Sequence, residues 1–441
     1  MSSIRKWLLP PVAFIAMCMS LDTVPCLAQD TDGGGAVTPD SADAIRASLE
    51  RPPPKPPFDA VDAVGLPFEI VFFPLRVAGL TVAELVGLAV KPDPEPVQFI
   101  EALKDVGFRG GVGSIGPRSG VAARGGFVGL PPLFLQSAFS IRGSQRHRAG
   151  LRFEGREGER LEIAYTFWRN DEPYFYGGID SAEDINRVYL WDQQTFALAG
   201  SLRLPIRPSA VLSLVGRLAY EDNRVGRGRD PGTTPIQDDT LTAGLFGVEE
   251  RVKYLRGGAI IGLDLRYNEG LQTRGLYIEG SYDHFFGVDD TESDFRRVAV
   301  DLYGYLPINP RQQLALRLLT EVNRSLSGTG VPFYHLADLG SEHGGRAYHQ
   351  LRFQDLAMAA MMLEWRWEIW RELHERSRIE SFLFYDAGSV MPRLADFRID
   401  DVRRSVGIGW RLITSRSGLL TNYIAFGDDG VRYRFRFSTA F

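Results

Sequence analysis

The chain contains 441 residues, which is enough for one large domain or for two to three ordinary ones. Aromatic residues make up 11% of it, charged residues 24%, and the formal net charge is only -5, so neither a disordered chain nor a nucleic-acid-binding tail is indicated. We therefore expect a folded protein with no nucleic acid partner.

Residues 1–28 have the pattern of a secretory signal peptide. Arg5 and Lys6 precede an apolar stretch that runs to Leu21, and a small-x-small cleavage site ends at Ala28. Both cysteines of the chain lie within this segment. The mature chain is therefore predicted to leave the cytoplasm and to have no disulfide or Cys-metal chemistry.

The next two segments are predicted to precede the main domain. Residues 29–58 are rich in Gly, Asp, Ser and Pro and cannot bury enough apolar surface to fold, so we expect a disordered linker. Residues 59–105 are expected to form a periplasmic extension with short helices. Their apolar run, 66–90, contains three charged side chains, which argues against a membrane-spanning helix.

From about residue 106 onward, apolar side chains alternate with polar or small ones in segments separated by turn residues. In the stretch AMMLEWRWEIW (360–370), for example, Leu363 and Trp365 fall on one face and Glu364 falls on the other. We predict sixteen strands, near residues 106–114, 119–129, 133–143, 147–155, 161–170, 187–206, 210–223, 257–268, 275–287, 295–307, 312–325, 356–370, 378–390, 402–413, 418–427 and 431–441.

The strand number and the connections favour a closed barrel over a soluble β protein. Short connections such as 309–311 alternate with long ones such as 326–355, and an even strand count is typical of bacterial outer-membrane barrels. Closure also satisfies every backbone hydrogen bond in lipid, which an open sheet edge cannot do. We therefore predict an all-β transmembrane barrel of sixteen antiparallel strands over residues 106–441, in the bacterial outer membrane, with both termini in the periplasm.

The last segment, VRYRFRFSTAF, alternates aromatic residues with arginines. The aromatic residues are predicted to face lipid and to form the signal by which barrel-insertion machinery recognises the chain: Tyr433, Phe435, Phe437 and Phe441. The arginines are predicted to face a polar lumen: Arg432, Arg434 and Arg436. The pattern leaves open whether facing carboxylates neutralise these arginines or whether they set an ion preference.

The stretch VPFYHLADLGSEHGGRAYHQ (331–350) resembles the most diagnostic segment of the BamA/TamA superfamily of outer-membrane assembly and translocation barrels. There a Pro-Phe-Tyr strand end precedes a Gly-rich loop with an Arg-Gly-Tyr or Arg-Gly-Phe motif, which reads Arg-Ala-Tyr here. Other segments are similar to the family in compatible order: YFYGGID, LDLRYNEGLQTRG, LEWRWEI, FLFYDAGSV, SVGIGWRL and the Phe-ending last strand. The resemblance covers about residues 106–441.

The resemblance implies that the sixth extracellular loop, 326–355, folds back into the lumen and that its Arg346 meets acidic residues of the barrel wall. The residues agree with this, because Arg346 can donate a forked set of hydrogen bonds and Glu364 and Asp386 both fall on the polar faces of their strands. We predict that Arg346, Tyr348, Glu364 and Asp386 form a lock that holds the loop inside the barrel.

The chain departs from the family in two places. Ala347 occupies the position of the family's glycine, and it would be strained if that position requires a positive φ. Family members also carry periplasmic polypeptide-transport-associated domains, for which residues 60–104 are too few.

The resemblance implies a function in inserting or translocating proteins or other polymers, through a weak seam between the first and last strands. The implied partners are outer-membrane lipids, an unfolded outer-membrane protein or secreted client, and the machinery that inserts the barrel itself. Two alternatives remain open: a plugged, porin-like channel for small anionic solutes, and an outer-membrane enzyme.

The remaining sequence patterns give little support for an enzyme, a cofactor or a metal. His335, His343 and His349 cluster in one predicted loop, but they lack the spacing of metal ligands. No nucleophile motif and no phosphate-binding loop is present. We therefore expect no catalytic residues and no cofactor.

Overall fold

The computed structural model describes most of the predicted barrel region. The described residues are 108–113, 115–116, 118–119, 122–130, 132–155, 158–178, 180, 186–207, 209–228, 230, 232–269, 272–288, 293–371, 377–414 and 418–436. The predicted signal peptide, linker and periplasmic extension lie outside these residues, as do Phe437 and Phe441.

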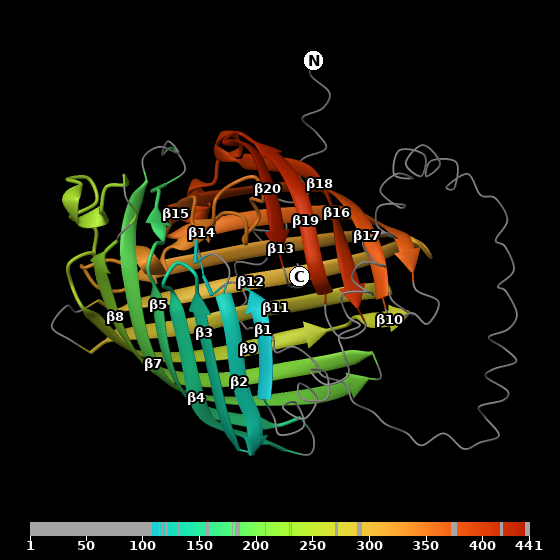
Figure 1. Ribbon diagram of the computed structural model, residues 1–441, viewed down its shortest axis with the longest axis horizontal. Coiled ribbons are helices and arrows are strands. Elements are labelled where there is room, and N and C mark those ends of the chain that lie inside the picture. The colour runs from blue at the N-terminus through green and yellow to red at the C-terminus, as the bar shows by residue number, and fades with distance from the viewer. Residues whose placement is uncertain are drawn as a thin grey trace, which may run out of the picture. The chain divides into compact units, whose positions relative to one another are not determined.

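In this part of the chain, sixteen long strands form one antiparallel sheet (Figure 1). They are β1 (Phe108–Gly113), β2 (Ala122–Leu130), β3 (Leu133–Ser140), β4 (Gln145–Glu154), β5 (Arg160–Asn170), β7 (Arg187–Arg207), β8 (Ala210–Arg227), β9 (Val252–Asp264), β11 (Gln272–Gly287), β12 (Phe295–Asn309), β13 (Gln312–Ser325), β16 (Ala357–Arg371), β17 (Ser377–Met391), β18 (Arg403–Thr414), β19 (Gly418–Gly427) and β20 (Gly430–Arg436). The prediction of sixteen antiparallel strands is confirmed.

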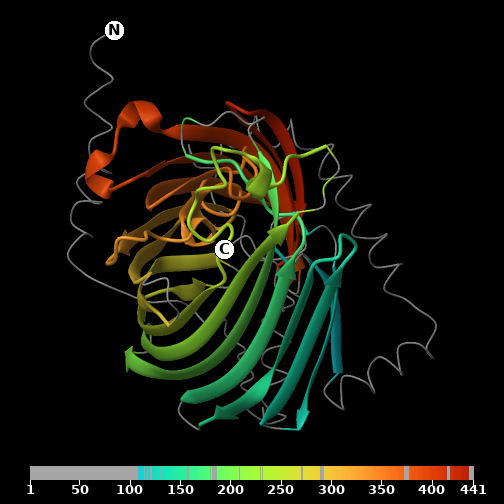
Figure 2. The same cartoon turned by 90° about the vertical axis from the view of Figure 1, so that its left-hand side faces the viewer.

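Each long strand pairs with the long strand next to it along the chain, from β1 with β2 to β19 with β20. The successive strands curve around a common interior (Figures 1 and 2). Within the described residues, no backbone pairing joins β1 to β20.

The strands expose one apolar face and turn the other inward, as their period of two residues requires. On β8, for example, Leu218 and Tyr220 are 54% and 42% exposed, whereas Ala219 and Glu221, which alternate with them, are buried. On β16, Leu363 is exposed and Glu364 is buried. Because this exposed apolar series runs over so many strands, hydrocarbon is the solvent that fits the outer face.

The connections alternate between tight turns and longer segments. At the turn between β12 and β13, the Asn309 side chain accepts a hydrogen bond from the backbone N–H of Arg311 at 2.9 Å, which lets the chain reverse within two residues. At the opposite ends of the strands, the segment between β8 and β9 contains a short 3₁₀ turn, η2 (Ile236–Asp238). The segments β6 (Tyr174–Phe175) and β10 (Tyr267–Glu269) are short additions to the sheet.

The longest described connection, residues 326–356 between β13 and β16, is called here the inward loop. It contains η3 (Phe333–His335) and the two short strands β14 (Ala337–Leu339) and β15 (Phe353–Asp355), which pair with each other. These strands lie against β16 and β17 (Figure 1). Two further 3₁₀ turns without buried residues, η4 (Leu394–Asp396) and η5 (Ile399–Asp401), follow β17.

An apolar cluster lies between the inward loop and the wall behind it. Leu339, Tyr348 and Phe353 from the loop pack with Met358 of β16 and Val390 of β17, and all five are at most 2% exposed. The loop is therefore anchored by hydrophobic packing as well as by polar contacts.

Among the described residues, no helix is long and apolar enough to cross a membrane.

Candidate functional site

The central part of the inward loop is a series of tight turns that presents Arg346 to the wall. The backbone N–H groups of His343 and Gly345 donate to the Gly340 carbonyl, and that of Tyr348 donates to the Gly345 carbonyl. Gly344 has a φ of +88°, and a Cβ there would collide with the Cβ of Ala360 on β16. Glycine is therefore required at this position for both conformation and space.

Arg346 is buried, 6% exposed, and its side chain contacts two carboxylates of the wall. Its Nε donates to Oδ2 of Asp386 at 2.9 Å and its Nη2 donates to Oδ1 at 2.6 Å, while Nη1 donates to Glu364. The Arg346 backbone N–H donates to Asp386 as well, at 3.1 Å. The guanidinium also lies 3.9 Å from the centre of the Phe384 ring, a cation–π contact. This forked geometry suits arginine and would not suit lysine.

Glu364 and Asp386 come from neighbouring strands and are completely buried, and they are called here the wall carboxylates. Glu364 also accepts hydrogen bonds from Arg366 Nε and Arg411 Nη2, both at 2.7 Å. Two carboxylates therefore share three buried arginines. Removing one partner from a buried ion pair typically costs about 3–5 kcal/mol, because the other charge is left uncompensated.

The contributions of Arg366 and Arg411 were not predicted from the sequence. Arg366 lies two residues from Glu364 and is therefore on the same face of β16, and Arg411 lies on the polar face of β18. The alternating pattern therefore indicated the direction of both side chains. Ser405, whose hydroxyl donates to Asp386 at 3.1 Å, was not predicted either. The alternating sequence pattern predicts which face of a strand a side chain occupies. It does not predict the register between strands, and that register determines these contacts.

The wall carboxylates keep Arg346 charged. Burial alone would lower the pKa of Arg346, but Asp386 and Glu364 raise it above its ordinary value. Arg346 therefore stays protonated throughout the physiological pH range. The contact acts as a permanent charge pair.

Tyr348 and Ala347 fix the next part of the loop. The Tyr348 hydroxyl donates to the Arg404 carbonyl at 3.0 Å and to Asp428 at 3.2 Å, and burial raises its pKa to about 12. Ala347 has no positive φ, so the strain considered for this position is absent. Its Cβ would lie 2.7 Å from a Cβ placed on Gly427, so a glycine in β19 makes room for the alanine.

The inward loop also reaches β20 and the turn before it. Arg432 Nη1 lies 2.7 Å from His349 Nε2, and Arg352 Nε donates to Asp429 at 2.8 Å. The His349 ring stacks on Tyr176, with ring centres 5.8 Å apart. Burial, with Arg432 close by, lowers the pKa of His349 to about 3, so this imidazole is neutral at ordinary pH.

The remaining predicted residues of the last strand lie on the expected faces as far as they are described. Tyr433 and Phe435 are 66% and 48% exposed on the outer face, and Arg434 is half-buried on the inner face. The side chain of Arg436 lies outside the described residues. The role of these aromatic residues as an insertion signal stays a prediction.

The three loop histidines have separate surroundings. His335 is buried among the Phe285, Phe295 and Tyr254 rings, whereas His343 lies 2.9 Å from Asp338, which raises its pKa to about 9. Within the part of the chain that the structure describes, no group of three or more His, Cys, Asp or Glu residues is placed to hold a metal ion.

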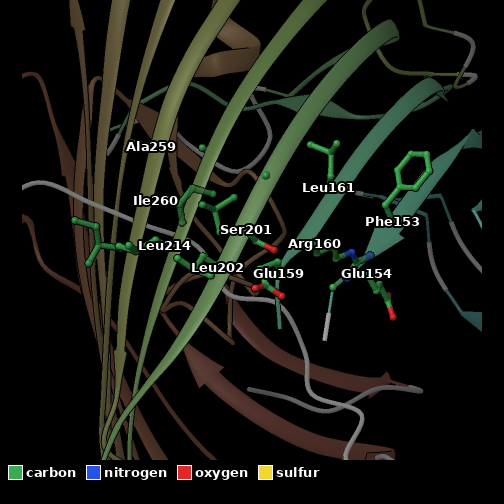
Figure 3. A pocket seen from close by; sticks show the side chains of 15 residues that line it. Phe153, Glu154, Glu159, Arg160, Leu161, Ser201, Leu202, Leu214, Ala259 and Ile260 are labelled. Atoms are coloured by element: carbon green, nitrogen blue, oxygen red, sulfur yellow. The ribbon is translucent and has the colours of Figure 1, made fainter. Parts of the chain in front are cut away.

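A pocket lies away from the inward loop, over β4, β5, β7, β8 and β9 (Figure 3). This pocket of about 740 Å³ is lined by apolar residues that include Phe153, Leu161 and Leu214. Gly200 and Gly216 pair directly across β7 and β8, and a Cβ on either would meet no atom within 4 Å. The missing side chains produce a hollow in the wall.

Comparisons with known proteins agree with this fold. Residues 255–441 match the Omp85 superfamily domain, a range that contains the inward loop and both wall carboxylates. The structure is similar to BamA from Haemophilus ducreyi lacking POTRA domains 1–3, with a TM-score of 0.52 and 17% identity over 75% of this chain and 69% of that one.

It is also similar to CdiB from Escherichia coli, with a TM-score of 0.51 and 12% identity over 75% of this chain and 61% of that one. The comparison with curated proteins gave no match. At these identities the two solved structures establish the fold. The part of the chain from residue 255 to 441 is thus similar to the Omp85 superfamily domain, and the fold is that of the BamA and CdiB barrels.

Proposed function

We propose that this chain inserts proteins into the outer membrane or translocates them across it, using the seam between β1 and β20. The observation that carries the proposal is the inward loop, which is held on the wall by Arg346, Glu364 and Asp386 within the Omp85-matching part of the chain. A client protein, either an unfolded outer-membrane protein or a secreted chain, is the proposed partner.

The first and last strands of the sheet, β1 and β20, suggest a physical mechanism in which each can offer an edge to a client. An edge strand presents free backbone N–H and C=O groups, and these are costly in hydrocarbon, where water cannot satisfy them. A client strand can pair with such an edge, as peptides do when they add a strand to an exposed sheet. Within the described residues, β1 and β20 have no pairing with each other that the client would have to break.

The inward loop would support this exchange by keeping the wall beside the seam in place. Its contacts reach β16, β17, β18 and the turn between β19 and β20, so it ties together the strands that lead to the last edge. We propose that β20 can then separate from β1 while the strands behind it keep their register. We also propose that the tight-turn end of the barrel, and with it both termini, faces the periplasm.

A reversible covalent staple tests the seam. One cysteine would be placed within residues 108–113 and another within 431–435, and the purified protein would be reconstituted in vesicles with an unfolded barrel protein as the client. We expect the oxidised staple to abolish acceleration of client insertion and reduction to restore it. The predicted lack of cysteine in the mature chain makes the introduced pair unique.

The matched control is a staple inside the wall. Phe426 and Val431 are direct partners across β19 and β20, and both are exposed on the outer face. The Phe426→Cys/Val431→Cys staple closes no seam, so we expect full activity after oxidation. Full activity of the oxidised seam staple would refute the proposed mechanism.

A further inference from the structure

Charged side chains collect on the outer face where the apolar series ends, at the end of the strands that leads into the long connections. On β8 the outward residues are apolar through Leu218 and Tyr220 and then change to Asp222 and Arg224. On β12 and β13 the same change occurs after Val298 and Val322. These positions correspond to the boundary between hydrocarbon and lipid headgroups.

A polar pocket of about 420 Å³ lies at this boundary, over β5, β7 and β8. Its charged lining consists of Arg169, Asp192, Arg224 and Arg227. Arg169 donates two hydrogen bonds to Asp192, both 2.7 Å long, and Arg227 donates to Asp238. Because Asp192 and Asp238 each neutralise one of the three arginines, the pocket keeps one excess positive charge.

Arg224 is the lining residue whose charge is left without a counterpart. It lies directly opposite Asp192 in the register of β7 and β8, yet both oxygens of Asp192 are taken by Arg169. Among the residues that the structure describes, Arg224 has no hydrogen bond and no ion pair. The Arg224 guanidinium is therefore available to donate hydrogen bonds to a ligand on the lipid-facing rim of the pocket.

A second arginine arrangement at the same boundary points to the same ligand. Arg296 and Arg324 lie directly opposite each other across β12 and β13, both on the outer face. Like charges in such a pair are destabilising unless an anion lies between them. Neither side chain has a hydrogen bond or ion pair with any other described residue.

We propose that these arginines bind the phosphate groups of an anionic membrane lipid at the surface of the bilayer. The pocket at Arg224 would take one phosphate, and the Arg296–Arg324 pair would bridge another. Arginine forks match phosphate oxygens in geometry, and basic side chains at the headgroup level attract anionic lipids. The lipid-facing side of the barrel favours a headgroup over a free anion, because the acyl chains of the lipid would lie on the adjacent apolar face. This proposal does not depend on the proposed insertion activity.

Native mass spectrometry of the detergent-purified protein tests the site, with diphosphoryl lipid A as the probe and a zwitterionic phosphatidylcholine as the comparison lipid. Loss of one charge-assisted contact corresponds to about a tenfold change in affinity. We therefore expect Arg224→Gln to weaken lipid A binding about tenfold, and Arg296→Gln/Arg324→Gln to weaken it further. Phosphatidylcholine binding should be unchanged in all variants.

The matched control is Arg393→Gln, which removes an arginine from an exposed ion pair in the η4 turn. It changes the net charge by the same amount as Arg224→Gln, and we expect wild-type lipid A binding. Wild-type binding by Arg224→Gln and by the double variant would overturn the proposal. If inorganic phosphate displaced lipid A completely from the wild-type protein, the assignment to a lipid headgroup would be wrong.

Discussion

Two regions of the barrel wall contain the same charged group in different surroundings. On β4 and β5, Glu162 is surrounded by Arg148, Arg152 and Arg160. On β16 and the elements around it, Glu364 is surrounded by three arginines as well, one of which comes from the inward loop. The arginine side chains around Glu162 are 22–34% exposed, whereas those around Glu364 are 7–10% exposed.

The difference shows that the inward loop, rather than the choice of residues, makes the second cluster strong. Partly exposed ion pairs contribute about 0–1 kcal/mol, because water screens them and the side chains lose entropy. Loss of one partner from a buried pair costs about 3–5 kcal/mol. Of these two clusters, the one at Glu364 receives an arginine from the loop, and it lies within the Omp85-matching range. We infer that the lock, and not the general charge pattern of the lumen, is the functional feature.

The largest effect should come from removing the loop's arginine. Arg346→Ala would leave Asp386 and Glu364 buried with less compensation, so we expect a loss of about 3–5 kcal/mol in the free energy of unfolding. Urea unfolding in lipid vesicles, followed by tryptophan fluorescence, measures it. Arg393→Ala, in the exposed pair with Asp396, is the control and should leave the free energy of unfolding nearly unchanged, because water screens the pair. Equal losses in the two variants would remove the distinction between the clusters.

The turn that presents Arg346 gives a second test. Gly344→Ala must adopt a positive φ and also collide with Ala360, whereas Gly330→Ala in the same loop must adopt a positive φ but meets no atom within 4 Å. The first variant should therefore be less stable than the second by about 1–3 kcal/mol, the usual cost of overpacking. Thermal unfolding of both variants checks this. The prediction fails if the two alanines are equivalent.

The loop histidines should give opposite pH dependences. Burial lowers the pKa of His349 to about 3, so its contribution is complete above pH 6.5 and is lost as the pH falls towards 3. Asp338 raises the pKa of His343 to about 9, so its contribution is complete below pH 6.5 and is lost as the pH rises through 9.

The stability of the loop should therefore be greatest near pH 6.5 and should decline both towards pH 3 and towards pH 9. The groups that face His349 are Arg432 and Arg434 on β20, Arg352 in the loop, Arg118 near β2 and the Tyr176 ring. In a limited-proteolysis profile over pH, His349→Gln should flatten the acidic limb alone and His343→Gln the alkaline limb alone. A single variant that flattened both limbs would contradict the assignment.

The smallest effect is expected in the exposed cluster. Glu162→Gln should cost at most about 1 kcal/mol, because its arginines remain in contact with water. The same substitution in the buried cluster, Glu364→Gln, should cost at least about 2 kcal/mol more. Parallel urea titrations of the two variants give the difference directly. A cost at Glu162 as large as the cost at Glu364 would mean that burial does not separate the two regions.

Alternation in the sequence was sufficient to predict the strands and the inward or outward direction of their side chains. The bounds of β13 and β19 agree with the predicted 312–325 and 418–427. The contact of Arg346 with Glu364 and Asp386 was anticipated from the family resemblance together with strand faces. The fitting of Ala347 against Gly427 could not be anticipated, because it depends on how the loop meets a strand about eighty residues away in the chain.

The outward-facing arginines proposed to bind lipid also show what the sequence pattern does not predict. Alternation places Arg296 and Arg324 on the outward faces of their strands, but only the register between β12 and β13 makes them direct neighbours. Arg224 is likewise distinguished by the fact that Arg169 occupies Asp192. Periodicity predicts the face of a residue, and the pairing of strands determines its partner.

Hydrogen–deuterium exchange of the barrel in lipid nanodiscs tests the lock most directly. The backbone amides of residues 337–355 should exchange slowly in the wild-type protein and much faster in Arg346→Ala, while the amides of β16 and β17 stay protected in both. Equal exchange of these loop amides in the two proteins would contradict the account.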